Sequence, residues 1–236
     1  MRAVFIADIG DKKVDEIIIE GSNARHLITV VRIRANEKLM VLDGNGTQII
    51  GLVKSIEDKK ITLTVKNVEY FSNTKRFDLA LGIPKKDAFE DSVRAACEIG
   101  LGSIIPVQME YSQFTPKKND RLNKLIESSL IQSNNPFFLD IKDLINFKNL
   151  TELFSSYDRV FYFCSHQNFP VKKTLEITAS DRVLMVIGPE GGLSAAEEEA
   201  LSTHKNVSFI NLPSYILKTP TAVSVCSGWL FAKMPN

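Results

Sequence analysis

A glycine-rich loop follows the apolar run 183–187, and its residue types have the clearest capacity for chemistry in this sequence. Its glycines, Gly188, Gly191 and Gly192, allow sharp turns and a close approach of the backbone to a ligand. Ser194, with Glu197 three residues later, has the pattern of a capping box and predicts the start of a helix. The segment therefore predicts backbone N–H groups that are open to a ligand at the end of a strand, where open α/β sheets bind ligands. An ordinary strand-to-helix turn is the alternative interpretation.

Two further loops are expected at the same edge of a parallel sheet, because each follows a predicted strand. One is the segment 165–168, after the strand that ends at Cys164, and the other runs through the segment 211–222. The closing helix is predicted to start near Thr219 or Thr221, either of which is a suitable capping residue, and Pro220 is tolerated in a first turn.

The composition of the 236 residues, with 44% hydrophobic and 24% charged residues, is that of a soluble globular protein. The net charge of +1 does not indicate a globally basic nucleic-acid binder, so any affinity for RNA must come from local clusters. The cysteines, Cys97, Cys164 and Cys226, are odd in number and widely spaced, which predicts reduced thiols in a cytoplasmic protein. The histidines form no ligand-spaced pair, so no metal is expected. No apolar stretch is long enough to span a membrane.

Familiar nucleotide and hydrolase motifs are missing from the sequence. It contains no G-x-G-x-x-G after a strand, no Walker A loop, no H-E-x-x-H and no G-x-S-x-G. Hydride transfer, ATP hydrolysis and serine hydrolysis are therefore disfavoured.

The elements that must position these loops belong to the second of two predicted domains. Residues 1–72 read as mostly β, with strands at 38–42, 47–53 and 61–66 and a short helix at 23–31, which suggests a small barrel. A polar break at 71–76 precedes the second domain, 73–236, where strands and helices alternate. That alternation predicts a parallel sheet with helices on both faces. Its strands are expected at 77–83, 104–107, 160–164, 183–187 and 207–212, and its helices at 87–99, 119–132, 194–201 and 221–231.

Several motifs together resemble one known family. IGPEGGLS, followed by LPSYILKTPTA, resembles the paired C-terminal motifs of the small-subunit ribosomal RNA methyltransferase E family, within the SPOUT superfamily. HLITVVRIRANEKLMVLDG resembles its N-terminal PUA-like barrel signature, and LGIPKKDAFEDSVRAACEIGLGSIIPV and RLNKLIESSLIQSNNP resemble later segments. The resemblance covers nearly the whole chain in order. It implies a PUA-like β-barrel that binds RNA, followed by a SPOUT parallel-sheet domain with a C-terminal trefoil knot.

The resemblance also implies a cofactor, S-adenosylmethionine, in a pocket made by the three loops. Backbone groups at the glycine turns would hydrogen-bond adenine and ribose, and apolar side chains would pack on the adenine face. Those apolar residues also have a simple interpretation as core. The implied cofactor-binding residues are Cys164, Ser165, Ile187, Gly188, Pro189, Glu190, Gly191, Gly192, Leu193, Leu212, Ser214, Ile216, Leu217 and Thr219.

The implied reaction is methylation of N3 of a uridine in the 16S ribosomal RNA of the small subunit. The cofactor supplies an activated methyl group, so alignment and loss of the N3 proton remain for the protein. Lys218 stands where the family usually has arginine, and a catalytic role beside the uracil carbonyls is the hypothesis for it. A surface lysine near a helix start is the equal alternative. Glu190 is expected to orient the cofactor ribose or to form a structural hydrogen bond.

RNA is expected to contact both domains, and family members are homodimers. Phosphate contacts position an RNA without reading its sequence. The closing helix, with Val223, Val225, Trp229 and Leu230, is expected to supply apolar dimer contacts, although Trp229 in a monomer core is the alternative. The expected RNA-binding residues are Arg25, Arg32, Arg34, Lys86 and Arg94.

The sequence also departs from the family pattern. The usual ILRTETA is ILKTPTA here, with Lys218 and Pro220, so the planar fork of arginine and a carboxylate are lost. The helix after Arg121 also lacks the family's usual arginine. We expect these changes to weaken RNA binding and turnover more than cofactor binding. Two rival functions follow: a non-catalytic RNA-binding or ribosome-assembly protein with the same fold, and a SPOUT enzyme that methylates another RNA nucleotide.

Overall fold

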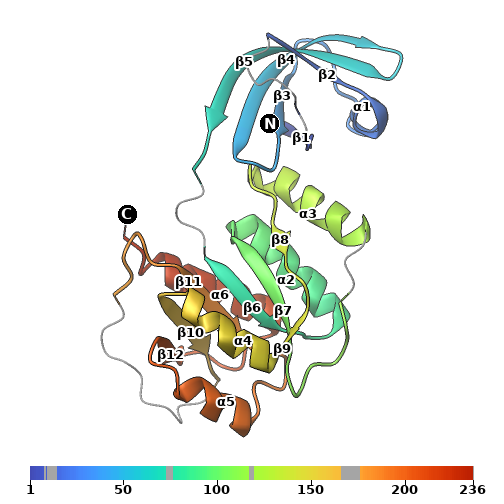
Figure 1. Ribbon diagram of the computed structural model, residues 1–236. Helices are drawn as coiled ribbons and strands as arrows, with labels where there is room; N and C mark the ends of the chain where they lie inside the picture. The colour runs from blue at the N-terminus through green and yellow to red at the C-terminus, as the bar shows by residue number, and fades with distance from the viewer. Residues whose placement is uncertain (8, 10–14, 73–76, 117–119, 166–175, 236) are drawn as a thin grey trace. The chain divides into compact units, whose positions relative to one another are not determined.

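The computed structural model describes residues 1–7, 9, 15–72, 77–116, 120–165 and 176–235 (Figure 1). Its contacts divide the chain into a first unit, Met1–Asn73 with Ile126–Phe138, and a second unit, Thr74–Leu125 with Leu139–Asn236. Helix α3 (Asp120–Ser133) therefore begins in the second unit and ends in the first. The domain ranges expected from the sequence, 1–72 and 73–236, do not assign residues 126–138 to the first domain.

The N-terminal part of the first unit is a β structure with the short helix α1 (Gly21–Thr29). Its sheet has the order β1-β3-β4-β5-β2, in which β1 is parallel to β3 and the other neighbours are antiparallel. Every strand of this sheet, together with α1, contributes to one apolar interior, as expected for a small barrel. The strands are β1 (Arg2–Phe5), β2 (Glu16–Ile19), β3 (Lys38–Leu42), β4 (Thr47–Glu57) and β5 (Lys60–Tyr70).

Residues 126–138 join the first unit through the turn after β3. The carboxylate of Asp43 accepts hydrogen bonds from the backbone N–H groups of Asn45 (2.7 Å) and Thr47 (2.9 Å), which fixes the turn. Gly46 has a φ of +95°, and its N–H donates to the carbonyl of Pro136 at 2.9 Å. A Cβ on Gly46 would lie 2.7 Å from the ring of Phe137. Glycine is therefore required there both by conformation and by space.

The second unit contains a fully parallel sheet with the order β12-β10-β11-β6-β7-β8, and β9 also pairs with β7. Every residue of the strand Val183–Ile187 is buried, as a strand covered on both faces requires. The strands are β6 (Asp78–Gly82), β7 (Ser103–Gln108), β8 (Asp140–Ile141), β9 (Ile145–Asn146), β10 (Arg159–Phe163), β11 (Val183–Ile187) and β12 (Val207–Ile210).

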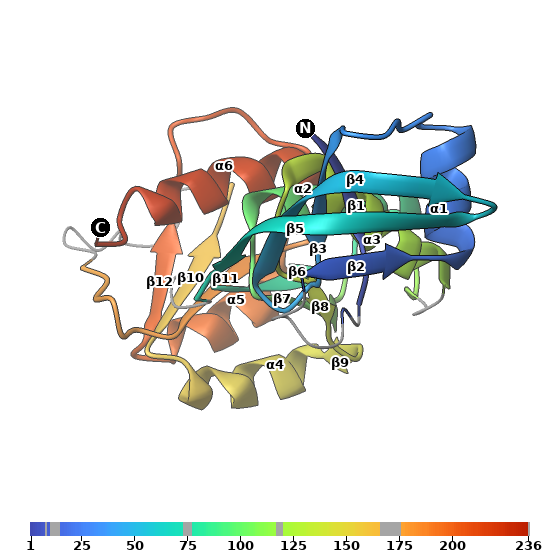
Figure 2. The same ribbon diagram turned by 90° about the horizontal axis from the view of Figure 1, so that it is seen from above.

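Helices cover both faces of this sheet, as Figure 2 shows. On one face α2 (Lys86–Ile99) packs against α6 (Thr219–Phe231). On the other face lie α4 (Phe147–Leu153), which continues into the 3₁₀ turn η1 (Phe154–Ser156), and α5 (Ala195–Ser202). Among the described residues, no helix combines the length and apolarity needed to cross a membrane.

One sequence-based expectation about local structure is wrong in detail. Neither Thr219 nor Thr221 caps α6: the N-cap is Lys218, without a side-chain capping bond, and Thr219 is the first helical residue.

Arg32 and Arg34 lie in the segment between α1 and β3, where Arg32 has a positive φ of 54°. Both arginines are exposed, while Ile33 between them is buried.

Ser227 gives a first testable prediction about stability. It is fully buried in α6, and its Oγ has no hydrogen-bond partner within the part of the chain that the structure describes. Ser227→Ala removes this unpaired hydroxyl and inserts a better helix former. We expect the free energy of unfolding to rise by about 1 kcal/mol in urea titrations. A fall of the same size would show that the hydroxyl is bonded in solution.

Candidate functional site

The carboxyl ends of β10, β11 and β12 form the site, because the sheet is parallel and β10 lies between the other two strands. Phe163 at the end of β10 pairs with Ile210 at the end of β12. Tyr162 pairs with Val186 of β11. The three segments that leave these strands therefore begin at the same edge, where a parallel sheet places its ligand sites.

The loop after β11 is held in a compact turn. The N–H of Gly192 donates to the carbonyl of Pro189 at 2.8 Å, and Gly192 has a φ of +71°. A Cβ on Gly188 would lie 2.8 Å from Leu193 Cδ1 and 3.1 Å from the backbone of Gly192. A Cβ on Gly82, at the end of the adjacent strand β6, would lie 2.5 Å from Pro189 Cδ. The glycines thus allow two backbone segments to approach closely, as the sequence predicted for this loop.

Helix α5 anchors this loop through its first turn. Ser194 and Glu197 form the expected capping box: Ser194 N–H donates to Glu197 Oε2 at 2.9 Å, and Glu197 N–H donates to Ser194 Oγ. The second carboxylate oxygen of Glu197 accepts from the N–H of Glu110 at 3.0 Å. Glu197 is only 8% exposed. Its side chain therefore ties the glycine loop to the segment that follows β7.

A second buried carboxylate supports the same loop. Glu198 is 6% exposed and accepts a hydrogen bond of 2.9 Å from the hydroxyl of Tyr162 in β10. Burial, followed by the hydrogen bond to Glu198, raises the pKa of the Tyr162 phenol far above its ordinary value. Tyr162 is therefore a neutral donor at physiological pH.

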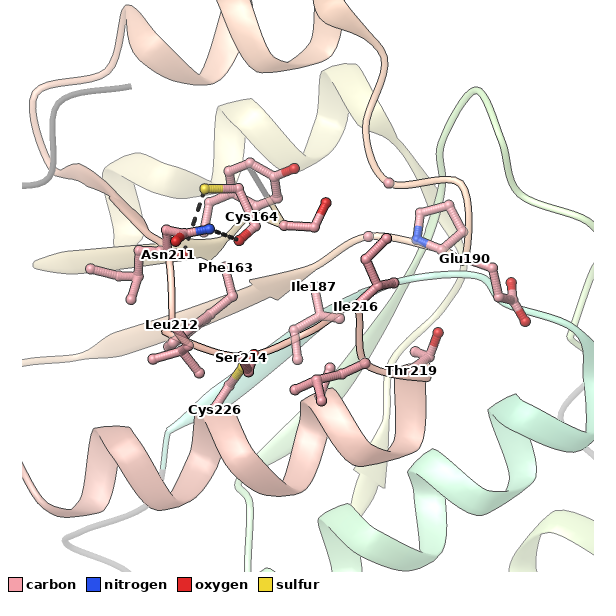
Figure 3. Close-up of a pocket in the computed structure, with 18 of the residues that line it drawn as sticks. Phe163, Cys164, Ile187, Glu190, Asn211, Leu212, Ser214, Ile216, Thr219 and Cys226 are labelled. Atoms are coloured by element: carbon pink, nitrogen blue, oxygen red, sulfur yellow. Dashed lines mark hydrogen bonds between the residues drawn. The ribbon is translucent and has the colours of Figure 1, made fainter. Parts of the chain in front are cut away.

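The segments after β10 and β12 are joined at Cys164 and Asn211, as Figure 3 shows. The N–H of Cys164 donates to the carbonyl of Ile210 at 2.9 Å, and its thiol contacts the same oxygen at 3.6 Å. The amide nitrogen of Asn211 donates to the carbonyl of Cys164 at 3.2 Å. Beyond this contact, Ser214 N–H donates to the carbonyl of Leu212 at 2.7 Å and turns the chain toward α6.

One cavity collects residues from all three segments and from the start of α6 (Figure 3). Thr219, Ala222 and Cys226 share a face of α6, since they are three and four residues apart. The predicted cofactor residues that line the cavity are Cys164, Ser165, Ile187, Gly188, Pro189, Glu190, Gly192, Leu212, Ser214, Ile216, Leu217 and Thr219. Residues that sequence reasoning missed are Tyr162, Phe163, Ile210, Asn211, Tyr215, Ala222 and Cys226.

Three of the predicted cofactor-binding and catalytic residues do not line this cavity. Gly191 faces Tyr111 instead, because a Cβ there would lie 2.9 Å from Tyr111 Cβ. Leu193 is buried in the core of the second unit. Lys218 is exposed, and only its neighbours Leu217 and Thr219 line the cavity. His166, Gln167 and Asn168, expected in the loop after β10, lie outside the described residues.

Glu190 lines the cavity and also makes a structural contact. Its Oε1 accepts a hydrogen bond of 3.1 Å from the N–H of Lys85, the N-cap residue of α2. In Figure 3 its side chain extends to one side of the cavity, beside the chain segment that leads into α2. The expected structural hydrogen bond of Glu190 is therefore present.

The predicted RNA-binding cations are all exposed and belong to both units. In the first unit Arg25 lies in α1, and Arg32 and Arg34 lie between α1 and β3. In the second unit Lys86 is the first residue of α2, and Arg94 lies 3.9 Å from Asp91 one turn away. Exposed cations of this kind are available to phosphate. In the part of the chain described here, no cluster of three His, Cys, Asp or Glu residues is arranged to hold a metal ion.

Cys226 gives a second prediction, because burial raises the pKa of its thiol to about 12. The thiolate is the reactive form, so its population stays very small until the pH approaches that value. At pH 8 we expect iodoacetamide to modify Cys226 at least about a hundredfold more slowly than a free cysteine. The rate should rise steadily with pH, and mass spectrometry of the Cys226 peptide measures it. Half-buried Cys164 is the control, and equal rates at the two sites would contradict the expectation.

The all-parallel sheet of the second unit, with a glycine-lined cavity at its carboxyl edge, defines an α/β domain with a ligand site at that edge. Comparison with known families specifies the class further. The family model described as RNA methyltransferase domain matches residues 72–230 of this sequence. The family model described as RNA methyltransferase PUA domain matches residues 19–66. The chain therefore belongs to the RNA methyltransferase domain family.

Individual relatives agree with this assignment. The chain is 26% identical over 241 residues to ribosomal RNA small subunit methyltransferase E of Bacillus subtilis, covering 94% of this chain and 93% of the relative. It is 25% identical over 207 residues to the protein of the same name from Rickettsia conorii, covering 85% and 82%. The resemblance suggested by the sequence motifs is thus confirmed.

A solved structure has the same fold. The ribosomal RNA small subunit methyltransferase E of Neisseria gonorrhoeae, bound to S-adenosyl methionine, aligns with a TM-score of 0.84 and 19% identity over 98% of this chain and 97% of that one. The predicted fold class, a PUA-like domain followed by a parallel-sheet methyltransferase domain, is confirmed. The trefoil knot stays a prediction.

Proposed function

We propose that this protein transfers the methyl group of S-adenosylmethionine to N3 of a uridine in the 16S ribosomal RNA of the small subunit. The observation that carries the proposal is the cavity at the ends of β10, β11 and β12, which gathers twelve of the residues expected to hold that cofactor. The similarity to small-subunit methyltransferases, one of them bound to S-adenosyl methionine, supports the same reaction.

The cavity has the chemical character that this cofactor requires. Ile187, Leu212, Ile216 and Leu217 line it and offer apolar surface to an adenine ring. A Cβ on Gly192, which lines the cavity, would meet nothing within 4 Å, so a ligand can approach the backbone there. Ser165 after β10 and Ser214 after β12 are exposed and line the cavity, and they are proposed to hydrogen-bond the adenine edge and the ribose. The domain ranges 1–72 and 73–236 are proposed as the RNA-binding and methyl-transfer parts.

When bound, S-adenosylmethionine supplies an activated methyl group, so the protein's task is to align uridine N3 and to stabilise charge as the proton leaves. Lys218 is proposed for the second role. It is the N-cap residue of α6, and both of its neighbours line the cavity. Its long, exposed side chain is free to turn toward a uracil carbonyl when RNA is present. Glu190 is proposed to hold the loop through Lys85 and to contact the cofactor ribose.

Methyl transfer to purified, undermethylated small subunits tests this proposal, with mass mapping of the product. We expect one methylated uridine in 16S ribosomal RNA. Lys218→Ala should lower kcat by about a hundredfold while the cofactor Kd stays within about twofold, because one charge-stabilising group contributes roughly that much to a rate. Lys205→Ala, an exposed lysine of the same unit outside the cavity, is the control. Unchanged turnover would remove Lys218 from the mechanism.

The rival functions are outcomes of the same experiment. Cofactor binding without transfer to any RNA would favour a non-catalytic RNA-binding or assembly protein, a possibility raised by Lys218 and Pro220 in place of the family's usual residues. A methylated nucleotide elsewhere, such as a transfer RNA ribose, would favour a SPOUT enzyme with another target. In either case the proposed substrate is wrong.

A homodimer is proposed for the working state. Tyr215 is 96% exposed and Ile216 is 85% exposed, although both line the cavity. Val225 (43%) and Phe231 (38%) add exposed apolar surface on α6. A partner subunit that covers this surface would bury these side chains and close the cavity. Analytical ultracentrifugation tests the dimer. The proposed location, the cytoplasm, agrees with a ribosomal substrate and with three cysteines that form no disulfide within the described residues.

A further inference from the structure

A second cavity lies entirely within the second unit, between the first turns of α2 and α3 and the segment 114–116. Its aromatic wall has a defined geometry. The rings of Phe89 and Phe114 meet edge to face, with centroids 5.8 Å apart and an interplanar angle of 72°. Phe89 is 3% exposed and belongs to the core, whereas Phe114 is only half-buried. A buried ring therefore holds in place a second ring that is accessible from the cavity.

The polar lining of this cavity is organised around one ion pair. Arg121 Nη2 lies 2.8 Å from Glu90 Oε2, and the side chains are 69% and 19% exposed, respectively. Glu90 therefore fixes the orientation of the guanidinium while most of the arginine remains open to solvent. Lys86, also in the lining, is exposed and forms no ion pair with any residue the structure describes. The cavity thus has two cations and one carboxylate beside an aromatic face.

This combination fits a nucleotide better than it fits a purely apolar ligand. Every nucleobase has a π face that stacks on an aromatic ring, and stacking of this kind tolerates any base. Arginine and lysine at the rim complement a phosphate. The carboxylate of Glu90 is an acceptor for an exocyclic amino group, the contact by which acidic side chains read cytosine.

The position of the cavity connects it with the cofactor site. Glu190 lines the first cavity and accepts a hydrogen bond of 3.1 Å from the N–H of Lys85. The next residue, Lys86, lines the second cavity. Consecutive Cα atoms are about 3.8 Å apart, so both cavities border the same helix start. An RNA strand whose target base meets the methyl group of a cofactor bound in the first cavity can therefore place a neighbouring nucleotide at the second.

The geometry points to a subsite for a nucleotide that flanks the methylated one, with its base on Phe114 and its phosphate at Lys86 and Arg121. This inference rests on the proposed function, since it assigns part of the same RNA. The subsite would hold the strand while the target base is turned out of its stack, and its aromatic wall would replace stacking that the RNA loses.

Binding of fluorescent single-stranded RNA that carries the target sequence, at saturating cofactor, tests the subsite. Phe114→Leu keeps most of the volume but removes the aromatic face, and we expect the RNA Kd to rise about tenfold. Arg121→Ala should raise it about fivefold and reduce its dependence on salt. Arg159→Ala is the matched control, because Arg159 is also exposed and paired, with Asp181 at 3.2 Å, at the opposite end of the sheet. It should leave the RNA Kd unchanged.

Single abasic sites introduced next to the target nucleotide separate stacking from general damage to the fold. In the wild type, one abasic position should weaken binding about tenfold, as Phe114→Leu does. In Phe114→Leu the same abasic site should have no further effect, because the partner of that base is already missing. Additive losses, or an unchanged Kd in Phe114→Leu, would overturn the subsite. A wild type that methylates small subunits while these results fail leaves the proposed function intact; failure of wild-type methylation rejects the function itself.

Discussion

Gly82→Ala is expected to raise the Kd for S-adenosylmethionine at least about tenfold and to lower the free energy of unfolding by about 1–3 kcal/mol. Gly82 is the last residue of β6 and has no direct place in the cavity. A Cβ there would lie 2.5 Å from Pro189 Cδ, 2.8 Å from Pro189 N and 2.5 Å from Met109 Sδ. Met109 can move its flexible end, but the backbone nitrogen of Pro189 moves only with the whole glycine loop. The methyl group therefore displaces the loop proposed to hold the cofactor.

Gly51→Ala is the matched control for this prediction. Gly51 is also a buried strand glycine, and a Cβ there would lie 3.2 Å from Leu63 Cβ and from the carbonyl of Thr64. It lies in β4 of the first unit, so it should lower stability while the cofactor Kd stays within about twofold. Calorimetry with S-adenosylmethionine and urea unfolding measure the two quantities. Equal cofactor affinity in Gly82→Ala and the wild type would show that the loop does not move or does not hold the cofactor.

Glu197→Gln is expected to cost about 2–3 kcal/mol of stability, nearly as much as Glu197→Ala. Both carboxylate oxygens of Glu197 accept from backbone N–H groups, Ser194 at 2.9 Å and Glu110 at 3.0 Å. A glutamine amide has one oxygen and one NH₂ group, so one of these two N–H groups would face a donor. The site is buried, and water cannot replace the lost acceptor.

The neighbouring Glu199→Gln is the control for Glu197, since its exposed side chain lies on the same helix, and it should change stability by less than about 0.5 kcal/mol. Urea titration measures all three variants. We also expect Glu197→Gln to weaken cofactor binding, because the glycine loop leads directly into this capping box. A Glu197→Gln protein as stable as the wild type would contradict the assigned hydrogen bonds.

Long periodic segments and strong turn signals explain most of what the sequence predicted correctly. The strand 183–187 and the helix from Ser194 agree closely with β11 and the cap of α5, because an uninterrupted apolar run and a capping box are both local signals. The strands β8 and β9 were missed since each has two residues, too few for any periodicity. β4 continues to Glu57, beyond its expected end at residue 53, and register shifts between Ile50 and Gly51 and between Val53 and Ser55 interrupt its period-two pattern.

The candidate site shows the same division between local and tertiary information. Gly188 and Gly192 were predicted from the turn that follows β11, which is a local property. Gly191 is a glycine for a different reason, its contact with Tyr111, and only the fold reveals that contact. Cys226 enters the cavity from the second turn of α6. The helical spacing of Cys226 from Thr219 and Ala222 is readable in the sequence, but the site predicted from the loops ends at Thr219.

Calorimetric titration of the purified protein with S-adenosylmethionine tests the central claim most directly, because everything proposed here requires that the cavity at the ends of β10, β11 and β12 holds that compound. We expect saturable binding with one site per subunit and a Kd in the micromolar range, weakened at least about tenfold in Gly82→Ala and unchanged within about twofold in Gly51→Ala. A wild-type protein that shows neither heat of binding nor thermal stabilisation at millimolar concentrations of the compound would contradict the account.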